Sequence, residues 1–345
     1  MKDNIELVIG TYQQVGEEAI QIVSLNTDSL EFYKKAVATG INSPSFVIVH
    51  SPYLFAVSEK NNGVVVSFYY DRVNNRLLEL SRQSTKGELP CYLLFDKQKK
   101  TLYAANYLTG NIAVFPVNKH YQIEECKQVL NHFGNSLNKG RQERAHAHSI
   151  ETIPFAPDYK VVQDLGSDAL HLYFTEGDGK LTYVKKFDVP LEHGPRHVAF
   201  SRDLKLIYVL SELSSTVDIF QFNVSTCMLQ LIQSISTLPE EYQSNNLAAD
   251  IHISDCGKFL LASNRGHNSI AIFEILVNGY LRLCEITHIR GETPRNFLVL
   301  SDNLVIIAAQ DSNNVIIAKL QDDGRLHLFS SEYQIKVPVC VKQVL

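Results

Sequence analysis

The sequence predicts an all-β protein, a β-propeller of seven blades closed into one ring. Three observations lead to this prediction: a unit that recurs along the chain, strands with alternating apolar residues inside each unit, and a split unit at the two ends. Propeller blades are small sheets arranged radially, so that only short and protected strand edges remain. Residues 1–345 are therefore expected to form a single domain.

Six segments of the chain share one pattern: a Pro or Ala anchor, a short apolar strand, a polar turn, a second strand, another turn and a third strand. The anchors are Pro44, Pro90, Ala147, Pro195, Ala248 and Pro294. A residue near the end of the second strand, mostly small and polar, follows each anchor: Ser58, Asn106, Asp164, Ser211, Asn264 and Ala309. The strands are rich in Val, Ile, Phe and Tyr, and Gly, Asn, Asp and Ser bound them. Such units, without recurring helices, are typical of propeller blades.

The two ends of the chain supply the seventh blade. The start, IELVIGTYQQVGEEAIQIVSL, resembles the second and third strands of a unit, and the end, VPVCVKQVL, resembles the missing first strand. We therefore expect the strand near Pro338–Lys342 to lie in one sheet with the strand near Leu7–Thr11. The best helix candidate, YQIEECKQVLNHF, lies between repeats, in an insertion at about 121–143 that is expected to be an exposed loop or short helix.

Composition excludes several classes of function. The chain has 32 Lys and Arg against 37 Asp and Glu, which gives no electrostatic footprint for nucleic acid or an anionic membrane. No signal peptide and no apolar run of membrane-spanning length are visible. Six cysteines are scattered without a C-x-x-C pair, which indicates a reducing compartment and a cytoplasmic location. The G-x-S-x-G, P-loop and dinucleotide motifs are missing, so no cofactor is expected.

Charged side chains recur at equivalent positions of different units. The start of the first strand and the end of the second lie on the same face of a blade, because the second strand returns along the first. Residues at these positions should therefore surround one mouth of the central channel. They include three arginines, two glutamates and one histidine: Arg196, Arg265, Arg295, Glu59, Glu212 and His148.

Structural roles compete with a functional one at each of these positions. His148 could be satisfied between blades, Arg196 and Arg265 could clamp carbonyl groups, and Glu212 could simply pair with one of those arginines. His146 and His148 alternate on a strand and could bind a metal together, but no third ligand is evident, so no metal site is expected. Asn106 stands at a strand end, where Asn commonly bonds the local backbone.

Longer stretches resemble a known family. ELPCYLLFDKQKKTLYAANYLTGNIAVFPV, RAHAHSI, GPRHVAFSRDLKLIYVLSELSSTVDIF and IHISDCGKFLLASNRGHNSIAIF are similar to the seven-bladed lactonases, which include bacterial 6-phosphogluconolactonases and fungal carboxy-muconate cyclases. The resemblance implies active residues in the H-x-H-S, GPRH, S-E-L and SNRG segments. They fall on His148, Arg196, Glu212 and Arg265. Ser211 and Ala309 stand where the family usually has Asn.

The resemblance implies hydrolysis of a sugar-acid lactone, with 6-phospho-D-glucono-1,5-lactone as the favoured substrate, so the expected partner is a small anionic lactone. Glu212 or His148 could be the general base, and Arg196 or Arg265 could stabilise the oxyanion or hold the phosphate. Further substrate contacts are expected from Arg295, Glu59, His146, His197, Asn106 and Gln310. The alternatives are a carboxy-muconate lactonising isomerase and a non-catalytic propeller that binds a ligand or protein. Convergence of the four active residues in space favours an enzyme, and scattered side chains favour a binding propeller.

Overall fold

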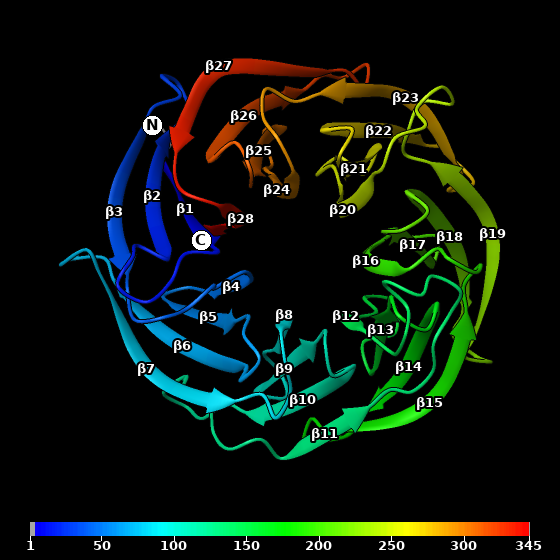
Figure 1. Ribbon diagram of the computed structural model, residues 1–345, viewed down its shortest axis with the longest axis horizontal. Coiled ribbons are helices and arrows are strands. Elements are labelled where there is room, and N and C mark those ends of the chain that lie inside the picture. The colour runs from blue at the N-terminus through cyan, green and yellow to red at the C-terminus, as the bar shows by residue number, and fades with distance from the viewer. Residues whose placement is uncertain (1–3, 345) are drawn as a thin grey trace.

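The computed structural model describes residues 4–344 as seven antiparallel sheets of four strands each, arranged radially in a ring (Figure 1). This confirms the seven-bladed propeller. No helix occurs within residues 4–344, so the described part of the chain contains no helix that could cross a membrane.

Six blades are continuous in sequence, and each runs from an inner strand to an outer one. Blades 2 to 4 consist of β4 Val47–His50, β5 Tyr53–Ser58, β6 Val64–Asp71 and β7 Arg76–Ser84; β8 Pro90–Asp96, β9 Thr101–Asn106, β10 Asn111–Pro116 and β11 Gln128–Asn131; and β12 Ala147–Thr152, β13 Tyr159–Asp164, β14 Ala169–Thr175 and β15 Leu181–Asp188. Blades 5 to 7 consist of β16 Pro195–Phe200, β17 Leu206–Ser211, β18 Thr216–Asn223 and β19 Met228–Ser236; β20 Leu247–Ile253, β21 Phe259–Arg265, β22 Ser269–Ile275 and β23 Leu281–His288; and β24 Pro294–Val299, β25 Leu304–Ala309, β26 Asn314–Leu320 and β27 Leu326–Gln334.

Blade 1 joins the two ends of the chain. Its order is β28 (Pro338–Val344), β1 (Asn4–Thr11), β2 (Ile20–Asn26) and β3 (Phe32–Ala38), so the last strand is the innermost one (Figure 1). Ile9 pairs with Val341 and Gly10 with Cys340. The predicted closure by N-terminal strands plus a C-terminal strand is confirmed.

The insertion after β10 contains a strand where the sequence analysis allowed a short helix. Residues of β11 pair with β10, with Asn131 opposite Asn111 and Gln128 opposite Val114. The helix assignment is wrong because a helix here would leave the outer edge of β10 unpaired. Part of the segment after β11 is buried rather than exposed, since His132 and Gln142 are both buried.

The apolar core lies between neighbouring blades. The second strands β9, β17 and β25 are buried along their whole length, because both of their faces pack against adjacent sheets. The outer strands are mostly exposed instead, with adjacent charged residues such as Lys185 and Lys186 both facing solvent on β15. Packing on both faces fixes the strand ends in space, and these ends form the mouths of the ring.

Candidate active site

Three side chains from three successive blades converge on one oxygen atom of a fourth residue, Glu212. Glu212, directly after β17, accepts hydrogen bonds at Oε2 from Arg196 Nε at 2.9 Å and Arg265 Nη2 at 2.7 Å. His148 on β12 places Nε2 at 4.0 Å from the same oxygen. Glu212, Arg196 and His148 are buried, and Arg265 is half-buried. The structure thus brings together the residues that the sequence predicts as active, each from the strand end expected of it.

A third arginine completes the surroundings of Glu212. Arg141 donates from Nη2 to Glu212 Oε1 and to the hydroxyl of Tyr107, the latter at 3.2 Å. Arg141 comes from the loop between β11 and β12. This loop packs closely on blade 4 at Gly166, where a Cβ would lie 1.9 Å from the carbonyl oxygen of Arg144. Sequence reasoning missed Arg141, which lies outside the repeat register; the only signal was its place in a loop that leads directly into the H-x-H-S segment.

Arg295 and Glu59 face a small cavity at the channel mouth, from the side of the ring opposite His148 and Arg196. Both line it together with His148, Arg196 and Cys91. The Arg295 guanidinium lies 5.2 Å from the ring centre of Tyr12, whose hydroxyl donates to Glu59 Oε2 at 3.0 Å. Tyr12 was also missed, because blade 1 is split and its equivalent positions are harder to align.

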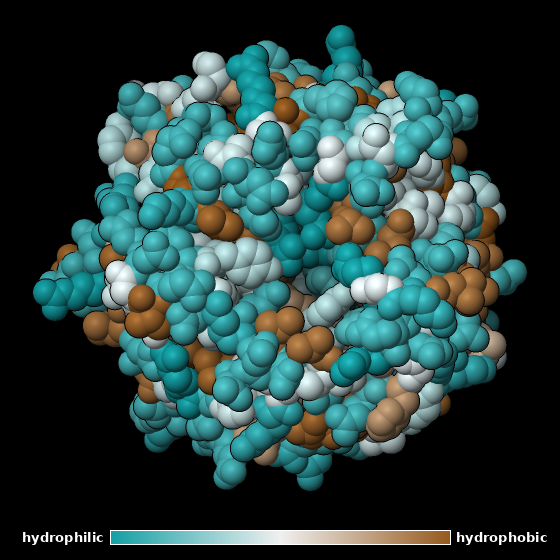
Figure 2. Space-filling view, viewed as in Figure 1, coloured by the Kyte–Doolittle hydropathy of each residue, from teal (hydrophilic) through white to brown (hydrophobic). Residues whose placement is uncertain are grey.

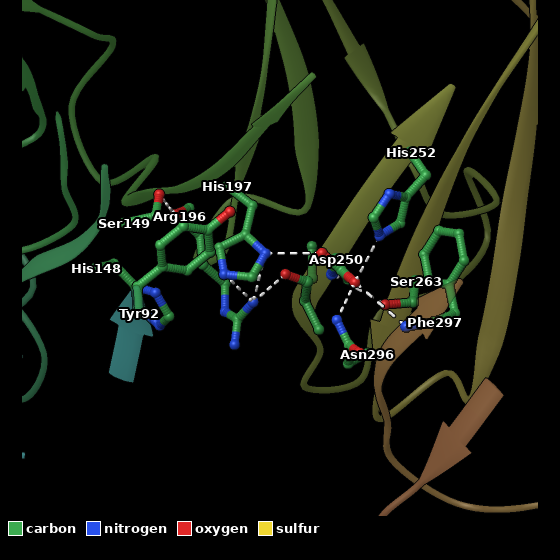
Figure 3. Close-up of polar contacts among 12 residues, drawn as sticks. Tyr92, His148, Ser149, Arg196, His197, Asp250, His252, Ser263, Asn296 and Phe297 are labelled. Atoms are coloured by element: carbon green, nitrogen blue, oxygen red, sulfur yellow. Dashed lines mark hydrogen bonds and ion pairs between the residues drawn. The ribbon is translucent and has the colours of Figure 1, made fainter. Parts of the chain in front are cut away.

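A second layer of polar side chains lies deeper along the axis (Figure 3). His197 Nδ1 lies 2.7 Å from Asp250 Oδ1, and Asp250 Oδ2 lies 3.0 Å from His252 Nε2. His197 also contacts Arg196, whose Nη1 is 3.1 Å from His197 Nε2. His197 lines both the mouth cavity and a second cavity near the far ends of the inner strands. It therefore lies between the mouth and the other side of the ring.

Three of the expected substrate contacts lie elsewhere. Asn106 is buried inside the blade, where it donates to Asn111 Oδ1 at 2.6 Å and to the Thr85 carbonyl at 3.3 Å. Gln310 donates to Asp311 Oδ1 at 2.9 Å and does not line the cavity. His146 stacks on Tyr107, with ring centres 4.5 Å apart, behind the residues that face the cavity.

The charges at the mouth do not cancel. Burial alone would raise the pKa of Glu212, but the positive charges of Arg265 and Arg196 hold it well below its usual range, so Glu212 is a carboxylate. Burial, reinforced by Arg196 and His197, holds the pKa of His148 well below its usual range, so this imidazole is neutral. Burial also lowers the pKa of Arg265 to about 10, which leaves it cationic at neutral pH.

Arg141, Arg196 and Arg265 contact Glu212, and Arg295 lines the cavity with Arg196 and Glu59. This cluster of four guanidinium groups and two carboxylates therefore has an excess of two positive charges. Seen along the ring axis, the surface is hollowed at its centre and hydrophilic residues gather in the hollow (Figure 2). Arginines beside a neutral buried imidazole provide the donors that a small anion requires and a group able to accept a proton from water.

Comparison with known proteins gives the family. The profile described as lactonase, 7-bladed β-propeller, matches residues 6–343, and the chain belongs to this family. It is 30% identical over 340 residues to the 6-phosphogluconolactonase of Bacillus subtilis strain 168, with 97% of each chain covered. It is 32% identical over 328 residues to the 6-phosphogluconolactonase of Formosa agariphila, covering 91% of this chain and 92% of that one. The periplasmic gluconolactonase of Pseudomonas aeruginosa superposes with a TM-score of 0.91 at 25% identity, with 99% of each chain covered.

Proposed function

We propose that this lactonase hydrolyses a phosphorylated sugar-acid lactone, 6-phospho-D-glucono-1,5-lactone. The observation that carries the proposal is the excess of arginine over carboxylate in the cluster of Glu212, Glu59 and their four neighbouring arginines. A phosphate group brings close to two negative charges at neutral pH, which matches that excess, and guanidinium groups bind phosphate through paired donors. The names of the Bacillus and Formosa relatives support the same substrate.

His148 is the general base of the proposed reaction. Its imidazole is neutral, whereas both oxygens of Glu212 already accept hydrogen bonds from arginines. Water attacks the lactone carbonyl carbon while His148 Nε2 takes a proton from it, and Arg196 or Arg265 stabilises the oxyanion. The bond from this carbon to the ring oxygen then breaks, and the ring oxygen takes the proton back from His148. The product is an open-chain acid, which ionises.

Glu212 is a positioning and electrostatic residue in this scheme. It aligns Arg196 and Arg265, and its charge stabilises the imidazolium that His148 becomes during the reaction. Arg141 is 34% exposed at the side chain and lies toward the rim, so we assign it, with Arg295, to the phosphate. Lactones open slowly without a catalyst, so this arrangement needs no covalent nucleophile.

The test is a substrate panel with one variant. Initial rates on 6-phosphogluconolactone, unphosphorylated gluconolactone and a carboxy-muconate are corrected for spontaneous opening. We expect preference for the phosphorylated lactone, and His148→Asn should lose roughly 10²–10⁴-fold in kcat. His327→Asn, on an exposed position of the outer strand β27, is the matched control. Wild-type rates in folded His148→Asn, or preferred turnover of the muconate, would overturn the proposal.

A cytoplasmic location is part of the same proposal. All six cysteines are free, which fits a reducing compartment, and a phosphorylated substrate is a metabolite of the cell interior. The Pseudomonas relative is described as periplasmic, so the location requires its own measurement. Fractionation of the native host should place the protein with cytoplasmic markers, and recovery with periplasmic ones would contradict the proposal.

A further inference from the structure

Three buried titratable side chains meet outside the active site, at the interface between blades 3 and 4. His132 follows β11, Asp164 ends β13 and His171 lies on β14. Their side chains are 1%, 0% and 6% exposed. Asp164 Oδ2 lies 3.6 Å from His132 Nδ1 and 3.4 Å from His171 Nε2, and all three atoms lie within 4.8 Å of one another.

The atoms that face one another in this cluster lack hydrogen-bond partners. His132 Nδ1, Asp164 Oδ2 and both nitrogens of His171 are unpartnered among the described residues. Distances of 3.4 and 3.6 Å exceed the 2.7–3.2 Å of an ordinary N–H···O bond, so the cluster does not satisfy itself. A buried polar atom without a partner is costly, and the three that meet here, His132 Nδ1, Asp164 Oδ2 and His171 Nε2, require a group that the side chains do not supply.

Equivalent interfaces in the same ring carry a neutral Thr and Asn, although Asn106 Oδ1 also lacks a partner within residues 4–344. The backbone N–H groups of Thr85, His132 and Thr237 make the same bond, to the carbonyls of Gly63, Gly110 and Ser215, so these three positions correspond. Thr237 Oγ1 donates to Asn264 Oδ1 at 2.7 Å, and Asn264 Nδ2 donates back to the Thr237 carbonyl at 2.9 Å.

Asn106 likewise bonds the Thr85 carbonyl. At the third of these interfaces His132 and Asp164 replace Thr and Asn. The fold therefore does not need the charged set, and the set calls for a separate explanation.

We propose that His132, Asp164 and His171 bind one divalent transition-metal ion, with zinc as the reference ion. Ligands at about 2.0–2.1 Å in a tetrahedron lie about 3.3 Å from one another, close to the two separations that involve Asp164. Two imidazoles and one carboxylate are ligands that zinc accepts, and a water molecule would take the fourth position.

The surroundings direct His132 Nδ1 and Asp164 Oδ2 into the cluster, whereas the His171 ring stacks on His132 with centres 3.9 Å apart and would turn for both imidazoles to bind one ion. His132 Nε2 lies 2.8 Å from the Tyr173 hydroxyl, so Nδ1 remains free, as expected of a ligating histidine with an outer partner. Asp164 Oδ1 accepts backbone N–H bonds from His146 at 2.7 Å, Gly166 at 3.1 Å and Ser167 at 3.2 Å. These bonds occupy one carboxylate oxygen and leave Oδ2 directed at the two imidazoles.

The role of the ion is structural. It would join the start of the loop that carries Arg141 to the blade that carries His148, because His132 precedes that loop and Asp164 bonds the backbone of His146 at the start of β12. No step of the proposed hydrolysis passes through the ion. This proposal departs from the sequence-based expectation of no metal site, and it uses residues other than His146 and His148.

The test replaces the cluster by the residues of the equivalent interfaces. The double variant His132→Thr/Asp164→Asn recreates the Thr–Asn pair and should fold. Protein without an affinity tag is stripped with chelator, loaded with zinc, dialysed, and measured by elemental analysis and thermal melting. We expect about one zinc per wild-type chain and a melting temperature a few degrees above that of the stripped protein.

The double variant should bind no zinc above background and show no zinc-dependent shift in melting temperature, whereas His120→Asn, an exposed histidine, should behave as wild type. Asp164→Asn alone serves as a second variant, with the visible spectrum of bound Co²⁺ as its readout, because tetrahedral cobalt absorbs strongly. Zinc-free wild type after loading, or unchanged binding in the double variant, would overturn the proposal.

Discussion

Replacing Glu212 with Gln removes a buried negative charge and keeps the shape of the side chain. His148 Nε2 lies 4.0 Å from Glu212 Oε2, and the imidazole becomes charged only when it takes a proton from water. Two unit charges at this distance attract by about 4 kcal/mol at an effective dielectric constant of about 20. Because this attraction exists in the transition state and not in the ground state, Glu212→Gln should lower kcat by about 10³-fold.

KM for the phosphorylated lactone should stay unchanged or fall, because one more uncompensated positive charge then faces the phosphate. The assay is steady-state kinetics on 6-phosphogluconolactone, with folding checked by circular dichroism. Glu151→Gln is the matched control, since Glu151 is a partly buried carboxylate that lines the second cavity and bonds Tyr92 at 2.5 Å. A kcat within tenfold of wild type in folded Glu212→Gln would refute the electrostatic argument.

Three further predictions follow from charge and topology. Burial lowers the pKa of His197 to about 3, so as the pH falls below about 6.5 the unfolded chain binds a proton at this residue and the folded chain does not. The free energy of unfolding should therefore decrease by about 2 kcal/mol between pH 6.5 and 5 because of His197. Urea titrations of His197→Gln should show a smaller decrease over the same range. Arg141→Gln should raise KM for the phosphorylated lactone roughly 10–100-fold and change unphosphorylated gluconolactone little, while Arg144→Gln in the same loop serves as control; equal effects on both substrates would argue against a phosphate contact. Deleting residues 338–345 removes β28 and exposes the inner edge of β1, so the melting temperature should fall sharply, and an unchanged melting curve would contradict the closure argument.

Much of the fold was predictable because each blade repeats the same physical solution. Alternating apolar residues and a polar turn recur at every strand pair, and the split unit at the ends has only one way to complete a blade. The strand β11 was not predictable from its own residues, since only four of them pair and a helical spacing of apolar residues overlaps them. Its identity depends on the free edge of β10, which is a tertiary fact.

The candidate site was predictable where the repeat register holds. Side chains on a strand alternate between faces, so a shift of one position separates Asn106, which is directed into its blade, from Tyr107, which contacts Arg141 at the mouth. Gln310 shares the register of Glu212, but its amide bonds Asp311 instead of turning toward the cavity. Arg141 belongs to an insertion with no counterpart in other blades, and periodicity cannot place such a residue.

The closure of blade 1 by β28 has a consequence for how the protein is made. During synthesis β1 emerges first and its innermost partner last, so β1 has an open inner edge until all other strands have left the ribosome. The final pairing joins residues from the two extremes of the chain, which makes it a slow contact to form. For that interval the nascent chain exposes a strand edge that can pair with another chain, so the protein should depend more on chaperones during synthesis than its compact ring suggests.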